Sequence, residues 1–190
     1  MMITKETVDL VKKWEGFVPT TYRDEAGVLT IGYGTTGMAG VGIDPKPGMK
    51  ITEAEAAEYL RRGLVKFSAQ IDKMITADYN HNEFGAMLSL AYNIGPLAFS
   101  KSSVLRHFNA GNKAAAADAF RMWNKITDPK TGKKVTSNGL KKRREDERAM
   151  FLRPVVDEIV LSDDTQAPSG GLGALIGAFI KAIIEAFKGR

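Results

Sequence analysis

Two carboxylic acids and a threonine stand close together near the start of the chain, within the segment WEGFVPTTYRDEAGVLT. Glu15 is followed nine residues later by Asp24, and Thr30 comes six residues after that. Cleavage of a glycosidic bond needs one carboxylic acid to protonate the leaving oxygen and a second carboxylate to activate water or attack the sugar. Each residue alone is ordinary, because aspartates near turns usually serve the turn. The joint pattern is what points to this chemistry.

The neighbours of the two carboxyl groups differ in polarity. Glu15 follows Trp14 and precedes Phe17 by two residues, and apolar surroundings keep a carboxylic acid protonated. Asp24 lies in the polar run RDE, where a carboxylate stays ionised. Thr30 is expected across the turn, where its hydroxyl can hold a water molecule. The distance between the carboxyl groups decides between inversion and retention, and both outcomes stay open.

A short helix and a hairpin are the elements that must position these residues. Residues 3–14 repeat apolar side chains along one helical face, and Gly16 is the usual kind of helix terminator. Residues 22–34 are rich in β-branched and aromatic residues, which predicts a small hairpin with its turn at residues 25–27. A helix end that faces a hairpin would put one carboxyl group on each wall of a cleft. The apolar face of the helix comprises Val8, Leu10, Val11 and Trp14.

The chain after the hairpin is predicted to be mainly helical. Glycine and proline indicate a loop over residues 35–50, and the capping box that starts at Thr52 opens a helix that runs to about residue 75. A buried helix is expected at 82–94, and a polar loop at 127–138. The other predicted helices cover 102–109, 113–123 and 139–153.

These elements predict an α+β fold: a mainly helical body with one small antiparallel hairpin near the N-terminus, plus a C-terminal amphipathic helix. The run SDDTQAPSGG has the composition of a linker. The predicted organisation is a domain at 1–161, a linker at 162–170 and a separate helix at 171–190.

Composition narrows the class of protein. A chain of 190 residues with 44% hydrophobic and 26% charged residues is long enough for one core and too apolar for wholesale disorder. It has no cysteine, which excludes disulfides and thiolate chemistry. His81 and His107 are too isolated for a metal site, and no phosphate-binding loop stands out, so we expect no metal and no cofactor.

The charge of the chain leaves a non-enzymatic alternative open. A net charge of +5 and a pI near 9.3 would draw the protein to nucleic acid, anionic lipid or acidic wall polymers. The basic run KKRR at 141–144 is followed at once by EDE, which weakens a phosphate-facing stripe, so no nucleic-acid partner is expected. Residues 1–17 lack the apolar core and cleavage site of a secretory signal, which predicts synthesis in the cytoplasm.

Four blocks of sequence resemble the phage-type lysozymes, the endolysins and muramidases of glycoside hydrolase family 24. The first is the Glu15, Asp24 and Thr30 spacing followed by GYG at 32–34. The others are FGAMLSLAYNIGPLAFSKSSVLRHFNAG at 84–111, RMWNKI around Trp123, and GLKKRREDERAMF at 139–151. They occur in the family's order and together span roughly residues 5–153.

The resemblance implies a lysozyme-like fold and a role for each of the three residues. Glu15 would be the general acid, Asp24 would position or activate the attacking water, and Thr30 would help to hold it. The substrate would be the β-1,4 bond between N-acetylmuramic acid and N-acetylglucosamine in bacterial peptidoglycan, with host cell lysis as the result. The protein would be a monomer that acts at the cell wall. A lytic transglycosylase, which cuts the same bond without water, is the enzymatic alternative.

The resemblance also implies a buried arginine that pairs with the catalytic glutamate. Arg143 matches that position, and Arg144 is the alternative if the register is one residue off. The other interpretation is a solvated helix face with i,i+4 pairs such as Arg143 with Glu147. The candidates for contact with substrate in the cleft are Tyr33, Asn93 and Trp123.

The segment 171–190 is strongly amphipathic on a helical wheel. As a helix, residues 171–188 would be about 27 Å long, but Lys181 and Glu185 interrupt the apolar run, which favours lying in the interface of an anionic membrane over crossing it. Docking on the enzyme body or self-association, for which Gly173 and Gly177 are a weak hint, is the alternative. The candidate membrane contacts are Leu172, Leu175, Ile176, Phe179, Ile183, Phe187, Lys181 and Lys188.

Overall fold

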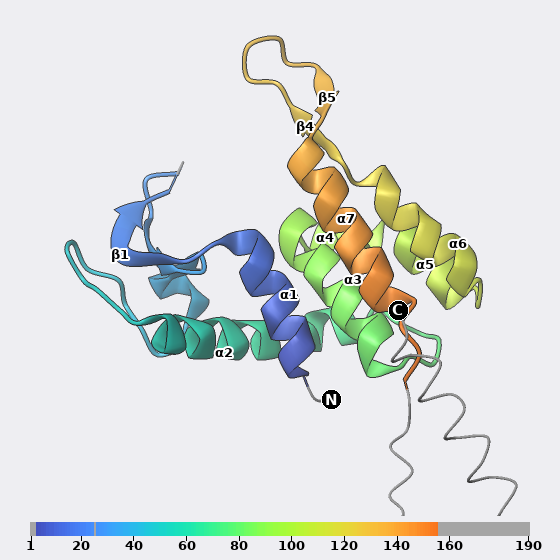
Figure 1. Ribbon diagram of the computed structural model, residues 1–190, viewed down its shortest axis with the longest axis horizontal. Helices are drawn as coiled ribbons and strands as arrows, with labels where there is room; N and C mark the ends of the chain where they lie inside the picture. Colours follow the sequence, from blue (N-terminus) through green and yellow to red (C-terminus); the bar gives the residue numbers. More distant parts are fainter. Residues whose placement is uncertain (1–2, 25, 156–190) are drawn as a thin grey trace, which may run out of the picture. The chain divides into compact units, whose positions relative to one another are not determined.

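The computed structural model describes residues 3–24 and 26–155 (Figure 1). The predicted linker, the amphipathic helix and its candidate membrane contacts, and the predicted domain end at residue 161 all lie outside the described residues. Within the described ranges, no helix is both long enough and apolar enough to cross a membrane.

Helix α1, Lys5–Glu15, ends where the sequence predicts. The Thr4 side chain caps its first turn by accepting a hydrogen bond from the backbone N–H of Thr7. Gly16 follows with a φ of 75°, a conformation that favours glycine, and its N–H bonds to the carbonyl of Lys12. Because the helix stops at this glycine, Glu15 is placed at its very end.

A three-stranded antiparallel sheet in the order β1-β2-β3 follows α1. Its strands are β1 Val18–Arg23, β2 Leu29–Gly32 and β3 Thr35–Thr36, and a short 3-10 helix, η1, covers Gly37–Ala39. The sheet thus begins earlier than the predicted hairpin and extends into the segment predicted as loop. The extension is strand β3, which pairs with β2 through Ile31 and Thr35. Its two residues are too few to show the alternation of polar and apolar side chains that predicts a strand.

The helical body is organised around α3, His81–Ile94, whose residues 82–91 are all buried. The prediction of a buried helix here is confirmed. Helix α3 packs against α1, α2, α4 and α7, and Figure 1 shows α7 lying alongside it. The other helices are α2 Glu53–Asp72, α4 Pro96–Ser100, α5 Ser103–Asn109, α6 Lys113–Ala119, the 3-10 helix η2 Phe120–Met122, and α7 Asn138–Phe151.

Close approach of α1, α3 and α7 depends on Gly85. A Cβ at this position of α3 would collide with the side chain of Thr7 from α1 and would lie 2.7 Å from Cε of Met150 in α7. Interatomic gaps of that size do not occur between packed carbon atoms. The glycine therefore lets the three helices that position Glu15 and Arg143 meet.

A second hairpin occupies the stretch 127–138 that was predicted as a loop. Strands β4 Lys125–Thr127 and β5 Lys134–Thr136 pair antiparallel, and the N–H of Ser137 closes the ladder on the carbonyl of Asn124 at 2.8 Å. All six strand residues are exposed, so no buried face imposes the alternating pattern by which a strand is usually recognised.

Candidate active site

Glu15, at the end of α1, is bound by an arginine from the far end of the described chain. Its side chain is 25% exposed, and its Oε1 accepts a hydrogen bond of 2.9 Å from Nη1 of Arg143 in α7. Only 4% of the Arg143 side chain is exposed. Charge-assisted hydrogen bonds of this kind are short and directional. The arginine therefore fixes the direction in which the Glu15 carboxyl group points.

A buried carboxylate holds Arg143 in turn. Oε1 of Glu147, one turn further along α7, accepts from Nε of Arg143 at 3.2 Å and from Nη2 of Arg144 at 2.8 Å. The hydroxyl of Ser89 on α3 donates to the same oxygen at 2.8 Å. The side chains of Arg144 and Glu147 are fully buried. Two guanidinium groups thus share one carboxylate, and Glu15 supplies the second negative charge.

The structure bears on both interpretations of the KKRRED helix, as the source of an arginine for Glu15 and as a solvated face with i,i+4 pairs. Arg143, not Arg144, contacts Glu15. The i,i+4 pair of Arg143 with Glu147 exists, but both side chains are buried, so the expectation of a solvated face is wrong for these residues. Neighbouring residues of a helix point about 100° apart, and Arg144 instead reaches Asn93 on α3, with Nη2 3.1 Å from Oδ1.

Asp24 and Thr30 are tied together through the backbone of Val28. Oδ1 of Asp24 accepts from the N–H groups of Ala26 at 2.9 Å and Val28 at 2.8 Å. The hydroxyl of Thr30, which is buried, donates to the carbonyl of Val28 at 3.1 Å, and the N–H of Asp24 donates to that same oxygen at 3.0 Å. The turn therefore fixes one carboxylate oxygen of Asp24 and leaves Oδ2 without a hydrogen bond to any described residue.

Tyr22, which the sequence did not single out, is influenced electrostatically by both carboxylates. It pairs with Thr30 across β1 and β2. Burial, and then the nearby carboxylates of Asp24 and Glu15, raise the pKa of the Tyr22 hydroxyl. Both charges therefore act on one phenol, which places the helix end and the hairpin turn in one electrostatic environment.

Tyr92 on α3 is a second tyrosine beside Glu15. Burial raises its pKa to about 12, with a further contribution from the Glu15 carboxylate that Arg143 opposes. The ring of Phe67 packs against it edge-on, at 5.7 Å between centroids. A neutral phenol therefore borders the pair of Glu15 and Arg143. In the sequence the only signal for Tyr92 is its place next to Asn93, in the block that resembles the phage-type lysozymes.

The three predicted substrate-contact residues lie in different surroundings. Tyr33 is buried, and its hydroxyl donates to Oε1 of Glu53 at 2.8 Å. Asn93 is exposed and accepts from Arg144. Trp123 is half-buried against the core. Contact of these three residues with substrate stays a prediction.

Comparison with known proteins identifies the family. The family model for phage lysozyme matches residues 12–147, a range that includes Glu15, Asp24, Thr30 and Arg143. The chain belongs to the phage lysozyme family. This confirms the predicted enzyme class, a glycoside hydrolase of the lysozyme type, and the α+β fold class with its mainly helical body.

Two curated relatives of the chain are endolysins. It is 37% identical over 153 residues to the endolysin of Salmonella phage P22, which covers 80% of this chain and 99% of the relative. It is 38% identical over 152 residues to the endolysin of Bacillus phage B103. That match covers 80% of this chain but 54% of the relative, so the chain spans about half of the B103 protein.

Three solved structures share the fold. The endolysin from Escherichia coli O157:H7 phage FAHEc1 is 43% identical with a TM-score of 0.69, over 80% of this chain and 94% of that one. A mutant of P22 lysozyme is 37% identical with a TM-score of 0.70, over 80% and 99%. The muramidase domain of SpmX from Asticaccaulis excentricus is 29% identical with a TM-score of 0.73, over 80% of this chain and 99% of that one.

Two glutamates of α7 allow the buried network to be tested against an exposed pair. Replacing Glu147 with alanine leaves two buried guanidinium groups without their shared carboxylate, and we expect the free energy of unfolding to fall by about 3–5 kcal/mol. The control is Glu145→Ala, which removes an exposed pair with Arg121 at 2.7 Å and should cost less than about 1 kcal/mol. Urea unfolding of both variants measures this. Equal losses would contradict the role of Glu147.

Proposed function

We propose that this member of the phage lysozyme family hydrolyses the β-1,4 bond between N-acetylmuramic acid and N-acetylglucosamine in bacterial peptidoglycan, with Glu15 as general acid. The observation that supports this most is the hydrogen bond of Arg143 to Glu15. The carboxylates of Glu15 and Asp24 both act on the pKa of the Tyr22 phenol. One carboxyl group is held by a buried cation and the other by a turn. That division suits two carboxyl groups with different tasks.

The hydrogen bonds assign a task to each oxygen atom of Glu15. Arg143 donates to Oε1 and therefore stabilises negative charge on that atom. The acidic proton is expected on Oε2, from which it passes to the glycosidic oxygen as the bond to the sugar breaks. The electron pair of that bond stays with the leaving oxygen, and the carboxylate that remains is stabilised by the arginine.

Asp24 and Thr30 supply the water. Oδ1 of Asp24 is occupied by the turn, so Oδ2 is the oxygen that accepts a proton from water as it attacks the anomeric carbon. The Thr30 hydroxyl donates to Val28 and keeps its lone pairs for a hydrogen from the same water. In this proposal the hairpin orients the nucleophile and α1 carries the acid.

Replacement of Glu15 by glutamine should abolish the proton transfer while preserving size and hydrogen bonding. We expect clearance of purified peptidoglycan to slow by about 100-fold or more, the usual contribution of a positioned general acid. Turbidity of a wall suspension is the measurement, and Glu6→Gln, an exposed glutamate in the first turn of the same helix, is the control. Folded Glu15→Gln that clears the wall at the control rate would refute the assignment.

Asp24→Asn removes the charge of the carboxylate but keeps the hydrogen bonds that the side chain makes in the turn. Asparagine keeps an oxygen that accepts from Ala26 and Val28, so we expect an unchanged fold and a turnover lowered by about 100-fold or more. Circular dichroism and release of reducing ends measure the two effects. Anhydro-sugar products from the native protein, with turnover unaffected by Asp24→Asn, would instead establish the transglycosylase alternative.

We also propose that the segment 171–190 binds an anionic membrane surface, on the basis of its amphipathic pattern in the sequence alone. Deletion of residues 168–190 should then reduce killing of intact cells while leaving clearance of purified wall unchanged. Both rates are measured on the same preparations. If the deletion changes neither rate, the membrane role is wrong.

A further inference from the structure

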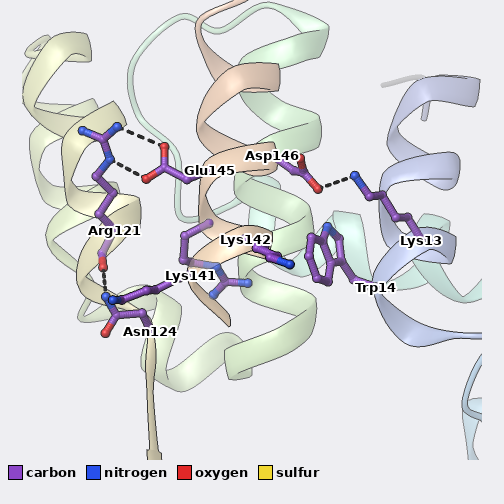
Figure 2. Close-up of a pocket in the computed structure, with 9 residues that line it drawn as sticks. Lys13, Trp14, Arg121, Asn124, Lys141, Lys142, Glu145 and Asp146 are labelled. Carbon is purple, nitrogen blue, oxygen red and sulfur yellow. Dashed lines mark hydrogen bonds and ion pairs between the residues drawn. The ribbon is translucent and has the colours of Figure 1, made fainter. Parts of the chain in front are cut away.

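A cavity of about 630 Å³ lies between α1, η2 and α7 (Figure 2). Lys13 and Trp14 line it from α1, Arg121 from η2, and Lys141, Lys142 and Arg144 from α7. None of Glu15, Asp24 and Thr30 is among its lining residues. Its volume is in the range of small-molecule sites, and it is separate from the proposed catalytic groups.

The wall of this cavity contains buried donors that have no acceptor. Arg144 is fully buried, and while its Nη2 bonds to Glu147 and Asn93, its Nε and Nη1 have no hydrogen-bond partner among the described residues. The buried indole Nε1 of Trp14 is likewise without a partner within the described ranges. Buried N–H groups without an acceptor are rare and costly in native proteins. Two buried carboxylate oxygens, Oε2 of Glu147 and Oδ2 of Asp146, also form no hydrogen bond with described residues, and Lys13 lies 2.7 Å from the latter. An acceptor is what would complete the donors of Arg144 and Trp14.

The charges around the cavity indicate that the acceptor is an anion. Two carboxylates also line it, but both are engaged: Glu145 by Arg121 at 2.7 Å and Asp146 by Lys13 at 2.7 Å. Figure 2 shows these two pairs on opposite sides of α7. Lys141 and Lys142 form no ion pair with any residue in the described part of the chain. Two ammonium groups and the Arg144 donors are thus left for a ligand.

We propose that this cavity binds a phosphate group. Two unpaired ammonium groups call for about two negative charges, which a phosphomonoester carries near neutral pH and a single carboxylate does not. Phosphate also offers three acceptor oxygens to the donors of Arg144 and Trp14. The indole ring of Trp14 gives the organic part of a phosphate ester an apolar surface. Free phosphate meets both conditions, whereas the phosphodiester of a lipid headgroup carries one negative charge and two terminal oxygens and meets them in part.

The indole N–H of Trp14 is a direct reporter, because the chain has two tryptophans and the second signal is assigned with Trp123→Phe. Full-length protein labelled with 15N-tryptophan is titrated with inorganic phosphate at constant ionic strength. We expect a saturable shift of the Trp14 signal, and a smaller one with acetate. A parallel titration with dihexanoyl phosphatidylglycerol below its micelle concentration tests the lipid source: tighter saturation than with phosphate identifies a headgroup, and weaker saturation identifies free phosphate.

A matched pair of double variants distinguishes a site from general attraction. Lys141→Gln with Lys142→Gln should raise the phosphate midpoint by about tenfold or more, because charge-assisted contacts are lost. Lys130→Gln with Lys133→Gln removes the same charge from exposed positions between β4 and β5 and should leave the midpoint within about twofold. The proposal is overturned by a Trp14 signal that does not saturate, by equal weakening in both variants, or by acetate that binds as well as phosphate.

Discussion

The arrangement of the helical body depends on the hydrogen bonds that the buried carboxylate of Glu147 accepts. It lies in the interior and accepts hydrogen bonds from two consecutive arginines of its own helix and from Ser89. Burying one guanidinium group without a counter-charge costs several kcal/mol, so two such groups are tolerated only because the carboxylates share them. Both arginines bind Oε1 of Glu147. Held in this way, Arg143 reaches Glu15, and Arg144 reaches Asn93 and lines the cavity.

The proposed catalytic residues are held by supports of two kinds. Glu15 is held by a side chain that the interior immobilises, and its helix ends at a glycine whose positive φ leads the chain into β1. Asp24 and Thr30 are held by backbone groups of a tight turn, through Val28. Groups supported in this way lose little freedom when a sugar chain binds, which is the condition for efficient proton transfer.

The parts of the fold that the sequence predicted are those with a local physical signal. Gly16 ends α1, Thr52 and Glu55 cap α2, and the apolar run ending at Ile94 forms the buried α3. The hairpin turn at Asp24 follows from its own hydrogen bonds. Strands β3, β4 and β5 are not predicted from the sequence, because strands of two or three residues, all exposed in β4 and β5, show no alternation of polar and apolar side chains.

In the site, the sequence pattern predicted which residues come together, but it did not predict which of them are buried. The spacing of Glu15, Asp24 and Thr30 is visible in the sequence, and the family resemblance selected Arg143. That Glu147 is buried was not visible, because a glutamate four residues from an arginine is the usual mark of a solvated helix. The hydrogen bond of the Tyr33 hydroxyl to Glu53 was not visible in the sequence either, because the two residues are 20 positions apart.

The bond between Arg143 and Glu15 joins residues 128 positions apart in the chain. During translation, Glu15, Asp24 and Thr30 leave the ribosome early, long before the arginine is made. A nascent or truncated chain can therefore carry all three proposed reacting residues and still have an acid whose carboxyl group nothing orients. The hydrogen bond that orients Glu15 forms only once α7, the last helix of the described body, has been made.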